Sequence, residues 1–150
     1  MPQAAGNIKG RKGARTWRQK LAQAGEDCAA RLFSRRGAQI VARNWRAGRY
    51  AEIDLIARER DGTLVFVEVK TRNQSGDGSG FPSAGFDAIH FHKQQKIVTS
   101  ARIYVSQHEY GETPVRLDVV VVEFAVPADS ALEDPLPEPH VIHVADAIQL

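Results

Sequence analysis

The charged residues Glu68 and Lys70 end an otherwise apolar segment that begins at Leu64. In an extended strand alternate side chains face opposite sides, so these two residues share one face. A carboxylate and an ammonium group at the end of a buried strand cost several kcal/mol in desolvation unless a partner compensates them. A bound divalent cation would be such a partner, and an ordinary strand-end ion pair is the alternative.

Asp54 lies in the preceding predicted strand, and the length of the intervening turn decides which way it points. A two-residue turn would place Asp54 opposite Val69 and away from Glu68. A three-residue loop at residues 60–62 would place Asp54 opposite Glu68, and its last residue is a glycine, as the left-handed end of such loops prefers. The two carboxylates would then lie about 5 Å apart at Cβ and repel each other. Magnesium binds one or two carboxylates together with water and phosphate oxygens, and would relieve that repulsion.

The pattern of apolar residues predicts the elements that position these side chains. Helices are predicted at residues 21–36 and 92–107, the second with a buried stripe of Ile97, Ala101, Tyr104, Val105 and His108. Strands are predicted at residues 38–43, 52–58, 63–71 and 116–124, with an edge strand at 141–144 and a final helical turn at 145–150. The glycine-rich residues 73–85 indicate a loop. The uninterrupted valines 119–122 imply a strand covered on both faces. This order favours an α/β fold with a mixed central sheet flanked by helices.

The composition is that of a globular domain with a basic N-terminal arm. The chain has 150 residues, a net charge of +2 and a single cysteine, Cys28. One cysteine excludes an intrachain disulfide and a cysteine-based zinc site, which suits a reducing cytoplasm. No apolar stretch is long enough to cross a bilayer. Residues 1–20 carry six basic residues and no acid, whereas the remainder has a net charge of −4. Residues 1–20 are expected to be either a phosphate-binding arm or a disordered tail, and residues 21–150 a single domain.

Taken in order, the motifs resemble a known superfamily. Asp54, then Glu68-Val69-Lys70 after a hairpin, with Glu26 on a preceding helix, resembles the PD-(D/E)xK nucleases, with Ile53 in place of the proline. Within that superfamily the chain is similar to the bacterial YraN-like family, which is itself similar to archaeal Holliday-junction resolvases. The resemblance runs through Gly25-Glu26, Arg43–Arg46, Glu52–Ala57, Val65–Arg72, Lys93–Tyr104 and Arg116–Val119.

The resemblance implies a restriction-endonuclease-like fold and a metal-dependent nuclease that hydrolyses DNA, including branched DNA. It implies that Asp54 and Glu68 bind Mg²⁺ or Mn²⁺, that Lys70 orients or helps to deprotonate the attacking water, and that Glu26 completes the acidic cluster, directly or through water. A helix-surface glutamate is the alternative for Glu26. Replacing Asp54 or Glu68 by alanine is expected to abolish cleavage and to stabilise the metal-free protein slightly. Because resolvases act on two-fold junctions as dimers, a homodimer is also expected.

Several cations flank the predicted cleft and would suit contacts with phosphates, with solvated surface charge as the alternative. The flanking cations are Arg43, Arg46, Arg49 and Arg72. Lys93 and Lys96 open the second predicted helix, facing away from its apolar stripe, and are expected either to contact the nucleic-acid backbone or to be solvated. Trp45 is expected either to stack on a base or to form part of the core. Asp118 is expected to be structural, with a place at the site as the alternative. The histidine pairs at 90/92 and 140/143 lack the further ligands that a zinc site needs.

Two other functions remain open from the sequence. The first is a nucleic-acid-binding module that keeps the carboxylates without cutting, which an assay of metal-dependent DNA cleavage would separate from a nuclease. The second is a protein-interaction domain with a basic tail. From Leu117 onward there are seven acidic residues and no lysine or arginine, a surface that should repel DNA.

Overall fold

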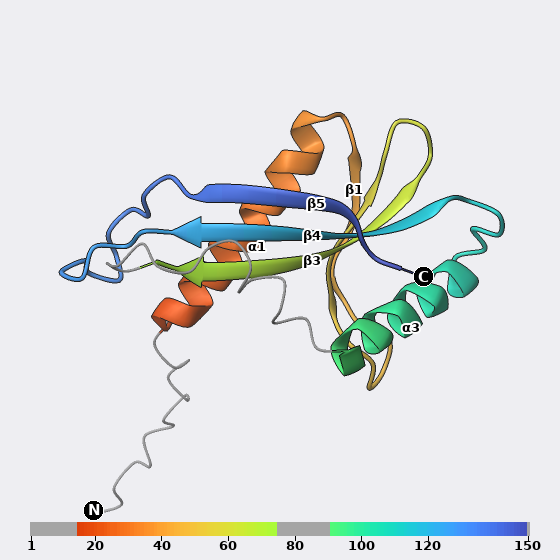
Figure 1. The fold of residues 1–150 in the computed structure, drawn as a ribbon, viewed down its shortest axis with the longest axis horizontal. Helices are drawn as coiled ribbons and strands as arrows, with labels where there is room; N and C mark the ends of the chain where they lie inside the picture. Colours follow the sequence, from red (N-terminus) through yellow and green to blue (C-terminus); the bar gives the residue numbers. More distant parts are fainter. Residues whose placement is uncertain (1–14, 75–90, 150) are drawn as a thin grey trace, which may run out of the picture.

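A computed structural model of the chain describes residues 15–74 and 91–149 (Figure 1). Along the chain these residues form the following elements: α1 (Trp17–Arg35), β1 (Gln39–Trp45), β2 (Ile53–Arg58), β3 (Leu64–Asn73), α3 (Phe91–Gln107), β4 (Val115–Phe124) and β5 (His140–Ile148). The five strands form one sheet in the order β1-β2-β3-β4-β5. Strands β3 and β4 are parallel, and every other neighbouring pair is antiparallel. The predicted mixed sheet flanked by helices is therefore confirmed.

Among the described residues, α1 covers one face of the sheet and α3 covers the other. Ala29 and Phe33 of α1 are fully buried against a layer that includes Val65 and Val67 of β3. On the other face Ile97, Ala101 and Tyr104 of α3 pack against a layer that includes Phe66. The central valines of β4 alternate between the two layers, with Val119 and Val121 facing α3 and Val120 and Val122 facing α1. This explains the uninterrupted valine run, since both faces of β4 are buried.

Helix α1 begins at Trp17 rather than at the predicted residue 21. The Thr16 hydroxyl accepts a hydrogen bond from the Gln19 backbone N–H at 3.2 Å, and the Gln19 side chain accepts one from the Thr16 N–H at 2.9 Å. This capping box satisfies two backbone donors at the helix start. Residues 17–20, which the charge pattern grouped with the basic arm, are therefore helical. Residues 1–14 lie outside the described residues, as does most of the glycine-rich segment predicted to be a loop.

Two predictions at the ends of elements are wrong. Residues 145–148 continue β5 and do not form a helical turn, because Asp146 adopts a left-handed φ of 53° at a register shift and Ile148 pairs with Leu117 of β4. Ile148 is also buried, which anchors the end of the strand. In α3, His108 follows the last helical residue and is exposed; its ring stacks on Tyr104 at 3.9 Å between centroids.

Asp118 has the structural role that the sequence suggested. It is fully buried on β4, where its carboxylate accepts hydrogen bonds from Arg116 Nε at 2.8 Å, from His143 Nε2 at 2.7 Å and from the Asp146 N–H at 2.9 Å. Burial by itself would raise the pKa of Asp118, but the hydrogen bonds from His143 and Arg116 outweigh it and the pKa is lowered. Asp118 therefore ties β4 to the edge strand β5.

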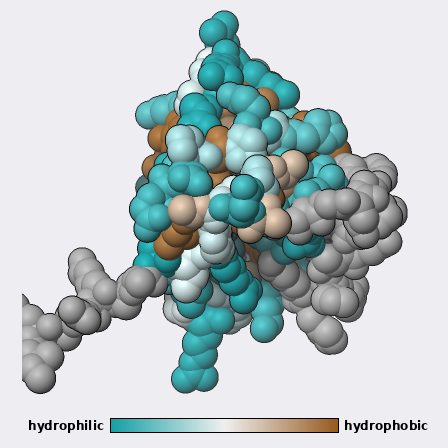
Figure 2. All heavy atoms as spheres, turned by 90° about the vertical axis from the view of Figure 1, so that its left-hand side faces the viewer, coloured by the Kyte–Doolittle hydropathy of each residue, from teal (hydrophilic) through white to brown (hydrophobic). Residues whose placement is uncertain are grey.

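Neither helix among the described residues has the length and apolar character needed to span a membrane. Figure 2 views the end of the molecule toward which β3 and β4 run, and hydrophilic residues cover most of that visible face. The hydrophobic residues on it lie in small separate spots rather than in one patch.

Candidate active site

The β2–β3 hairpin has the three-residue loop that brings Asp54 to the level of Glu68. The backbone N–H of Glu59 donates to Thr63 O at 2.9 Å, and the N–H of Gly62 donates to Glu59 O at 3.0 Å. Gly62 adopts a φ of 91°, the left-handed conformation that glycine permits. The register pairs Leu55 with Val67, so the next residues outward along the two strands are Asp54 and Glu68. The predicted odd-length loop is thereby confirmed.

Asp54 is held against the backbone of β3. Its Oδ2 accepts a hydrogen bond from the Val69 N–H at 2.7 Å. In the register of the hairpin Asp54 shares a face with Ile56 and Phe66, which belong to the core layer under α3. The Asp54 carboxylate is therefore fixed beside the segment that carries Glu68.

Glu68 and Lys70 form an ion pair at the edge of the core. Lys70 Nζ lies 3.1 Å from Glu68 Oε1, and the side chains are 14% and 5% exposed. Burial to this extent makes the Coulomb interaction stronger than that of a surface pair, and also makes each charge costly to leave uncompensated. The structure thus places two carboxylates and one ammonium group at the same end of β2 and β3.

Glu26 belongs to a different group of side chains. With its amide nitrogen turned toward the carboxylates, Asn44 donates to Glu26 Oε2 at 3.2 Å and to Glu52 Oε1 at 3.0 Å. Burial raises the pKa of Glu26 above its ordinary value; the Asn44 hydrogen bond and the charge of Arg43 lower it, and the charge of Glu52 raises it further. Among the side chains that the structure describes, no group of three or more acidic, histidine or cysteine residues is arranged to hold a metal ion. Glu26 therefore does not join Asp54 and Glu68 in a cluster of three acids.

Gly25 allows α1 to approach β3 closely. A Cβ atom built on Gly25 would lie 2.0 Å from Thr71 Oγ1, so only glycine allows α1 to approach the strand at this point. Thr71 directly follows Lys70, and Glu26 directly follows Gly25. The close contact between α1 and β3 thus fixes the position of Glu26 along the direction of β3, relative to the Glu68–Lys70 pair.

The predicted phosphate-binding cations have different surroundings. Arg43 pairs with Asp27 at 2.7 Å, and Arg46 pairs with Glu52 at 3.3 Å, each between partly exposed side chains. Arg72 is half-buried on β3 and Lys96 is exposed on α3. The side chain of Lys93 lies outside the described residues.

Sequence reasoning missed three residues of this region: Asn44, Glu52 and Tyr50. Asn44 has a φ of 50°, which asparagine tolerates better than most residues, and this turns its amide toward the two glutamates. The spacing of Glu52 two residues before Asp54 was an available signal. Trp45 is half-buried with its ring edge-on to Tyr104 at 5.1 Å, so it forms part of the core rather than a free stacking surface.

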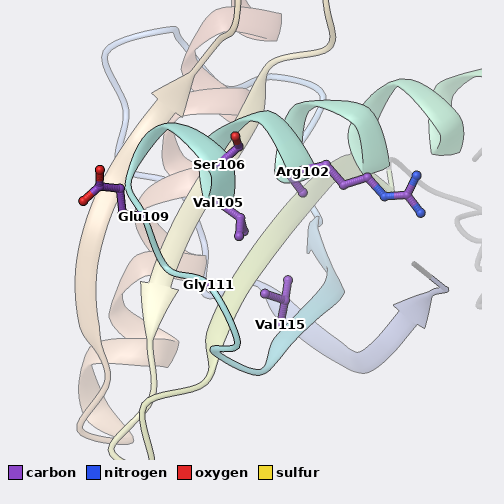
Figure 3. A pocket seen from close by; sticks show the side chains of 7 residues that line it. Arg102, Val105, Ser106, Glu109, Gly111 and Val115 are labelled. Atoms are coloured by element: carbon purple, nitrogen blue, oxygen red, sulfur yellow. The ribbon is translucent and has the colours of Figure 1, made fainter.

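A groove of about 570 Å³ lies elsewhere, at the C-terminal end of α3. Val105, Val115 and Gly111 line its centre, and the side chains of Arg102 and Glu109 extend in opposite directions from it (Figure 3). Only one of its lining residues is acidic, so it does not provide a paired-carboxylate site.

Comparison with known proteins identifies the family of this chain. The model of the uncharacterised protein family UPF0102 matches residues 25–122. The chain belongs to this family. A UPF0102 protein of Synechococcus sp. (strain JA-3-3Ab) is 41% identical over 110 residues, which cover 73% of this chain and 79% of the relative. A UPF0102 protein of Parafrankia sp. (strain EAN1pec) is 45% identical over 104 residues, covering 69% and 82%.

The UPF0102 match confirms the YraN-like family resemblance inferred from the motifs, and it spans Glu26, Asp54, Glu68 and Lys70. Among solved structures, a repair endonuclease from Pyrococcus abyssi matches with a TM-score of 0.37 and 18% identity. That match covers 71% of this chain and 39% of the endonuclease, so the chain spans about two fifths of that protein's length.

Proposed function

We propose that this UPF0102 protein is a metal-dependent nuclease that hydrolyses DNA phosphodiester bonds. The observation that carries the proposal is the three-residue hairpin loop, which sets Asp54 level with the buried Glu68. Two carboxylates at the same level of a hairpin repel each other, and Glu68 is also buried, so a cation bound between them would be stabilising. Lys70 pairs with Glu68, and a divalent cation would add positive charge beside both carboxylates.

The donor set fits a hard divalent cation. Asp54 and Glu68 would hold Mg²⁺ or Mn²⁺, because such ions accept one or two carboxylates and fill their remaining positions with water and phosphate oxygens. When bound, the ion would lower the pKa of the attacking water and offset charge that develops on the phosphate. The Val69 N–H holds the Asp54 carboxylate in place for this purpose.

Lys70 is proposed to orient the attacking water. Its ammonium group lies 3.1 Å from Glu68 Oε1, so it stands beside the carboxylates where the attacking water would be held. Glu26 is proposed to act as a positioning residue. Its carboxylate accepts a hydrogen bond from Asn44, and the same Asn44 amide also donates to Glu52.

The test is an incubation of full-length protein with linear, single-stranded and four-way-junction DNA, with Mg²⁺, with Mn²⁺ and with EDTA. Cleavage is expected only with metal, and Glu68→Gln or Asp54→Asn should reduce its rate at least about 100-fold, as losses of positioned catalytic groups do. Glu123→Gln is the matched control, because Glu123 is also 5% exposed and lies on the adjacent strand β4. Cleavage that survives in EDTA, or in both site variants, would refute the proposal. Metal-dependent binding without cleavage would favour the non-cutting module.

The proposal includes a homodimer formed at the groove on α3. In a two-fold contact a surface meets its own copy, so a groove with an apolar centre and opposite charges at its ends is complementary to itself. Arg102 and Glu109 provide those charges (Figure 3). The Arg102→Glu variant and the Glu109→Arg variant should each sediment as a monomer. The variant that carries both substitutions should sediment as a dimer again. A wild-type chain that sediments as a monomer at high concentration would exclude this assembly.

A further inference from the structure

The loop between β1 and β2 is anchored at both ends and exposed at its tip. At one end Trp45 packs edge-on against Tyr104 of α3. At the other end the hydroxyl group of the buried Ser100 of α3 donates a hydrogen bond to Ala51 O at 2.7 Å. The stems of the loop are therefore fixed to α3, the helix that covers the Asp54 face of the sheet.

Tyr50 projects from this fixed base into solvent. Its side chain is 48% exposed, and among the described residues no other large hydrophobic side chain is exposed. A tight turn presents it, because the Tyr50 N–H donates to Ala47 O at 3.1 Å and Gly48 adopts a left-handed φ of 54°. Arg46 directly precedes the turn and Arg49 lies within it, and both are exposed. The tip thus combines one aromatic ring with two guanidinium groups.

The tip is also close to the candidate active site. Tyr50 precedes Asp54 by four residues, and an extended chain rises about 3.3 Å per residue, so the two lie within about 13 Å. That distance is about four nucleotides at the 3.4 Å spacing of a stacked strand. A nucleic acid whose phosphate reaches Asp54 and Glu68 would therefore extend past Tyr50 within a few nucleotides.

We propose that Tyr50 stacks on an unpaired base within about four nucleotides of the bond to be cut, and that Arg46 and Arg49 hold the phosphates beside that base. The substrate class is then DNA with unpaired nucleotides, such as a flap, a gap or an open junction, rather than continuous duplex. This inference rests on the proposed function for the location of the cut. Base stacking on an aromatic ring needs no sequence, because every base has a π-face.

The surrounding charges are available for this role. Arg46 pairs with Glu52 at 3.3 Å, but the two side chains are 59% and 36% exposed, and an ion pair in such surroundings contributes little. A phosphate can therefore compete for the Arg46 guanidinium. A stable protein interface buries about 800 Å² on each partner, far more than one tyrosine ring offers, whereas one ring is the surface that one base requires. The chemistry of the tip favours a nucleotide over a protein.

The test measures binding without cleavage. Full-length protein in EDTA is titrated by fluorescence anisotropy against a hairpin duplex and against the same hairpin with a short single-stranded 3′ extension. Tyr50→Ala should weaken binding of the extended hairpin about 5- to 150-fold and leave the plain hairpin within about twofold. Tyr50→Phe should retain the affinity, because the ring remains. Arg49→Ala should weaken binding to both substrates, whereas Arg35→Ala, which removes an exposed arginine at the end of α1, should not.

The results separate this inference from the nuclease proposal. Equal binding of wild type and Tyr50→Ala to the extended hairpin would overturn the stacking role, whether or not the wild type cuts DNA with metal. Loss of affinity in Tyr50→Phe equal to that in Tyr50→Ala would also overturn it, because the ring would not be what binds. Selective loss in Tyr50→Ala would support the role even if no cleavage is found.

Discussion

The carboxylate of Asp54 accepts its hydrogen bond from the backbone N–H of Val69, at 2.7 Å. The regular pairing between β2 and β3 extends outward only to Leu55 and Val67. In the continued register Val69 would face Ile53, which lies beyond the last pair of the β2–β3 ladder. The Asp54 carboxylate thus accepts the backbone N–H that follows the last backbone pair of β2 and β3. A residue proposed to bind metal therefore also stabilises this end of the hairpin.

This hydrogen bond changes the expected effect of Asp54→Ala on the stability of the protein. Repulsion between two carboxylates alone would make Asp54→Ala slightly stabilising, as the sequence suggested. The structure adds the loss of a partner for a half-buried backbone N–H, which costs about 1–3 kcal/mol. Asp54→Ala is therefore expected to melt below wild type in EDTA, and Asp54→Asn, whose carbonyl oxygen can still accept, close to wild type. Thermal unfolding followed by circular dichroism checks this. A Tm of Asp54→Ala at or above that of wild type would show that repulsion outweighs the hydrogen bond.

Metal should raise the Tm only while both carboxylates are present. A ligand that binds the folded state alone at 100 times its Kd stabilises by about 2.7 kcal/mol. For a chain of this size that corresponds to a rise of about 5 to 10 °C. The rise with Mg²⁺ or Mn²⁺ should vanish in Glu68→Gln and persist in Lys70→Met, which keeps both carboxylates but should lose cleavage. Differential scanning fluorimetry measures it, with Glu123→Gln as the control. A full rise in Glu68→Gln would place the metal elsewhere.

Gly25→Ala should be destabilising although alanine is the better helix former. The added Cβ would meet Thr71 Oγ1 at 2.0 Å and Thr71 Cβ at 3.1 Å, so the helix or the strand must move. Overpacking of this kind costs about 1–3 kcal/mol. Thr71→Ala in the same chain should recover part of that loss, because it removes the nearer atom. The measurement is a double-mutant cycle of unfolding free energies in urea. Additive effects of the two substitutions would mean that the contact does not set the helix position.

Much of the fold could be predicted because its signals are local. The three-residue loop follows from the glycine at 62 and from the parity of the strands, and the double burial of β4 follows from its four consecutive valines. The end of β5 could not be predicted in this way. Residues 145–148 form a strand because Asp118, far away in sequence, accepts the Asp146 N–H at 2.9 Å. A tertiary hydrogen bond of this kind overrides local preference.

The candidate site shows the same division. The level of Asp54 and Glu68 could be predicted from the hairpin alone. The association of Glu26 with Asn44 and Glu52 could not, because it depends on the left-handed conformation of Asn44 and on the approach of α1 to β3. Neither feature has a periodic signal in the sequence.

Asp118 should contribute stability that depends on pH. Its pKa in the folded state is lowered, so its contribution is fully present above the pKa of the unfolded chain, near 3.8, and is lost as the pH falls below that value toward the folded pKa. Asp118→Asn should therefore lower the free energy of unfolding by about 3–5 kcal/mol at neutral pH, because Arg116 and His143 lose a buried charged partner. The difference from wild type should shrink below about pH 4. Urea unfolding at a series of pH values measures it, and a difference that stays constant down to pH 2.5 would contradict the role of the carboxylate.

The basic arm should supply affinity without selectivity, and the structure defines how to remove it. Deleting residues 1–20 would remove the Thr16 cap and also Lys20, whose ammonium group donates to the backbone oxygens of Leu132 and Asp134 at 2.5 Å each. Deleting residues 1–14 leaves those contacts in place and removes Lys9, Arg11 and Lys12. Each phosphate contact contributes about 0.7 to 0.9 to the slope of log affinity against log salt, so three cations account for a change of about 2 to 3.

The truncated protein should accordingly bind every DNA shape more weakly by a similar factor and with a flatter salt slope. Its preference for DNA with unpaired nucleotides should be unchanged, because Tyr50 and its arginines remain. The measurement is a salt titration of full-length and truncated chains on the plain and the extended hairpin. Replacing only Lys9, Arg11 and Lys12 by glutamine in the full-length chain is the matched control, since it removes the same charges without shortening the chain. If truncation leaves the slope as it was, the arm does not contact phosphates. If it erases the difference between the two hairpins, selectivity lies in the arm and not in the loop between β1 and β2.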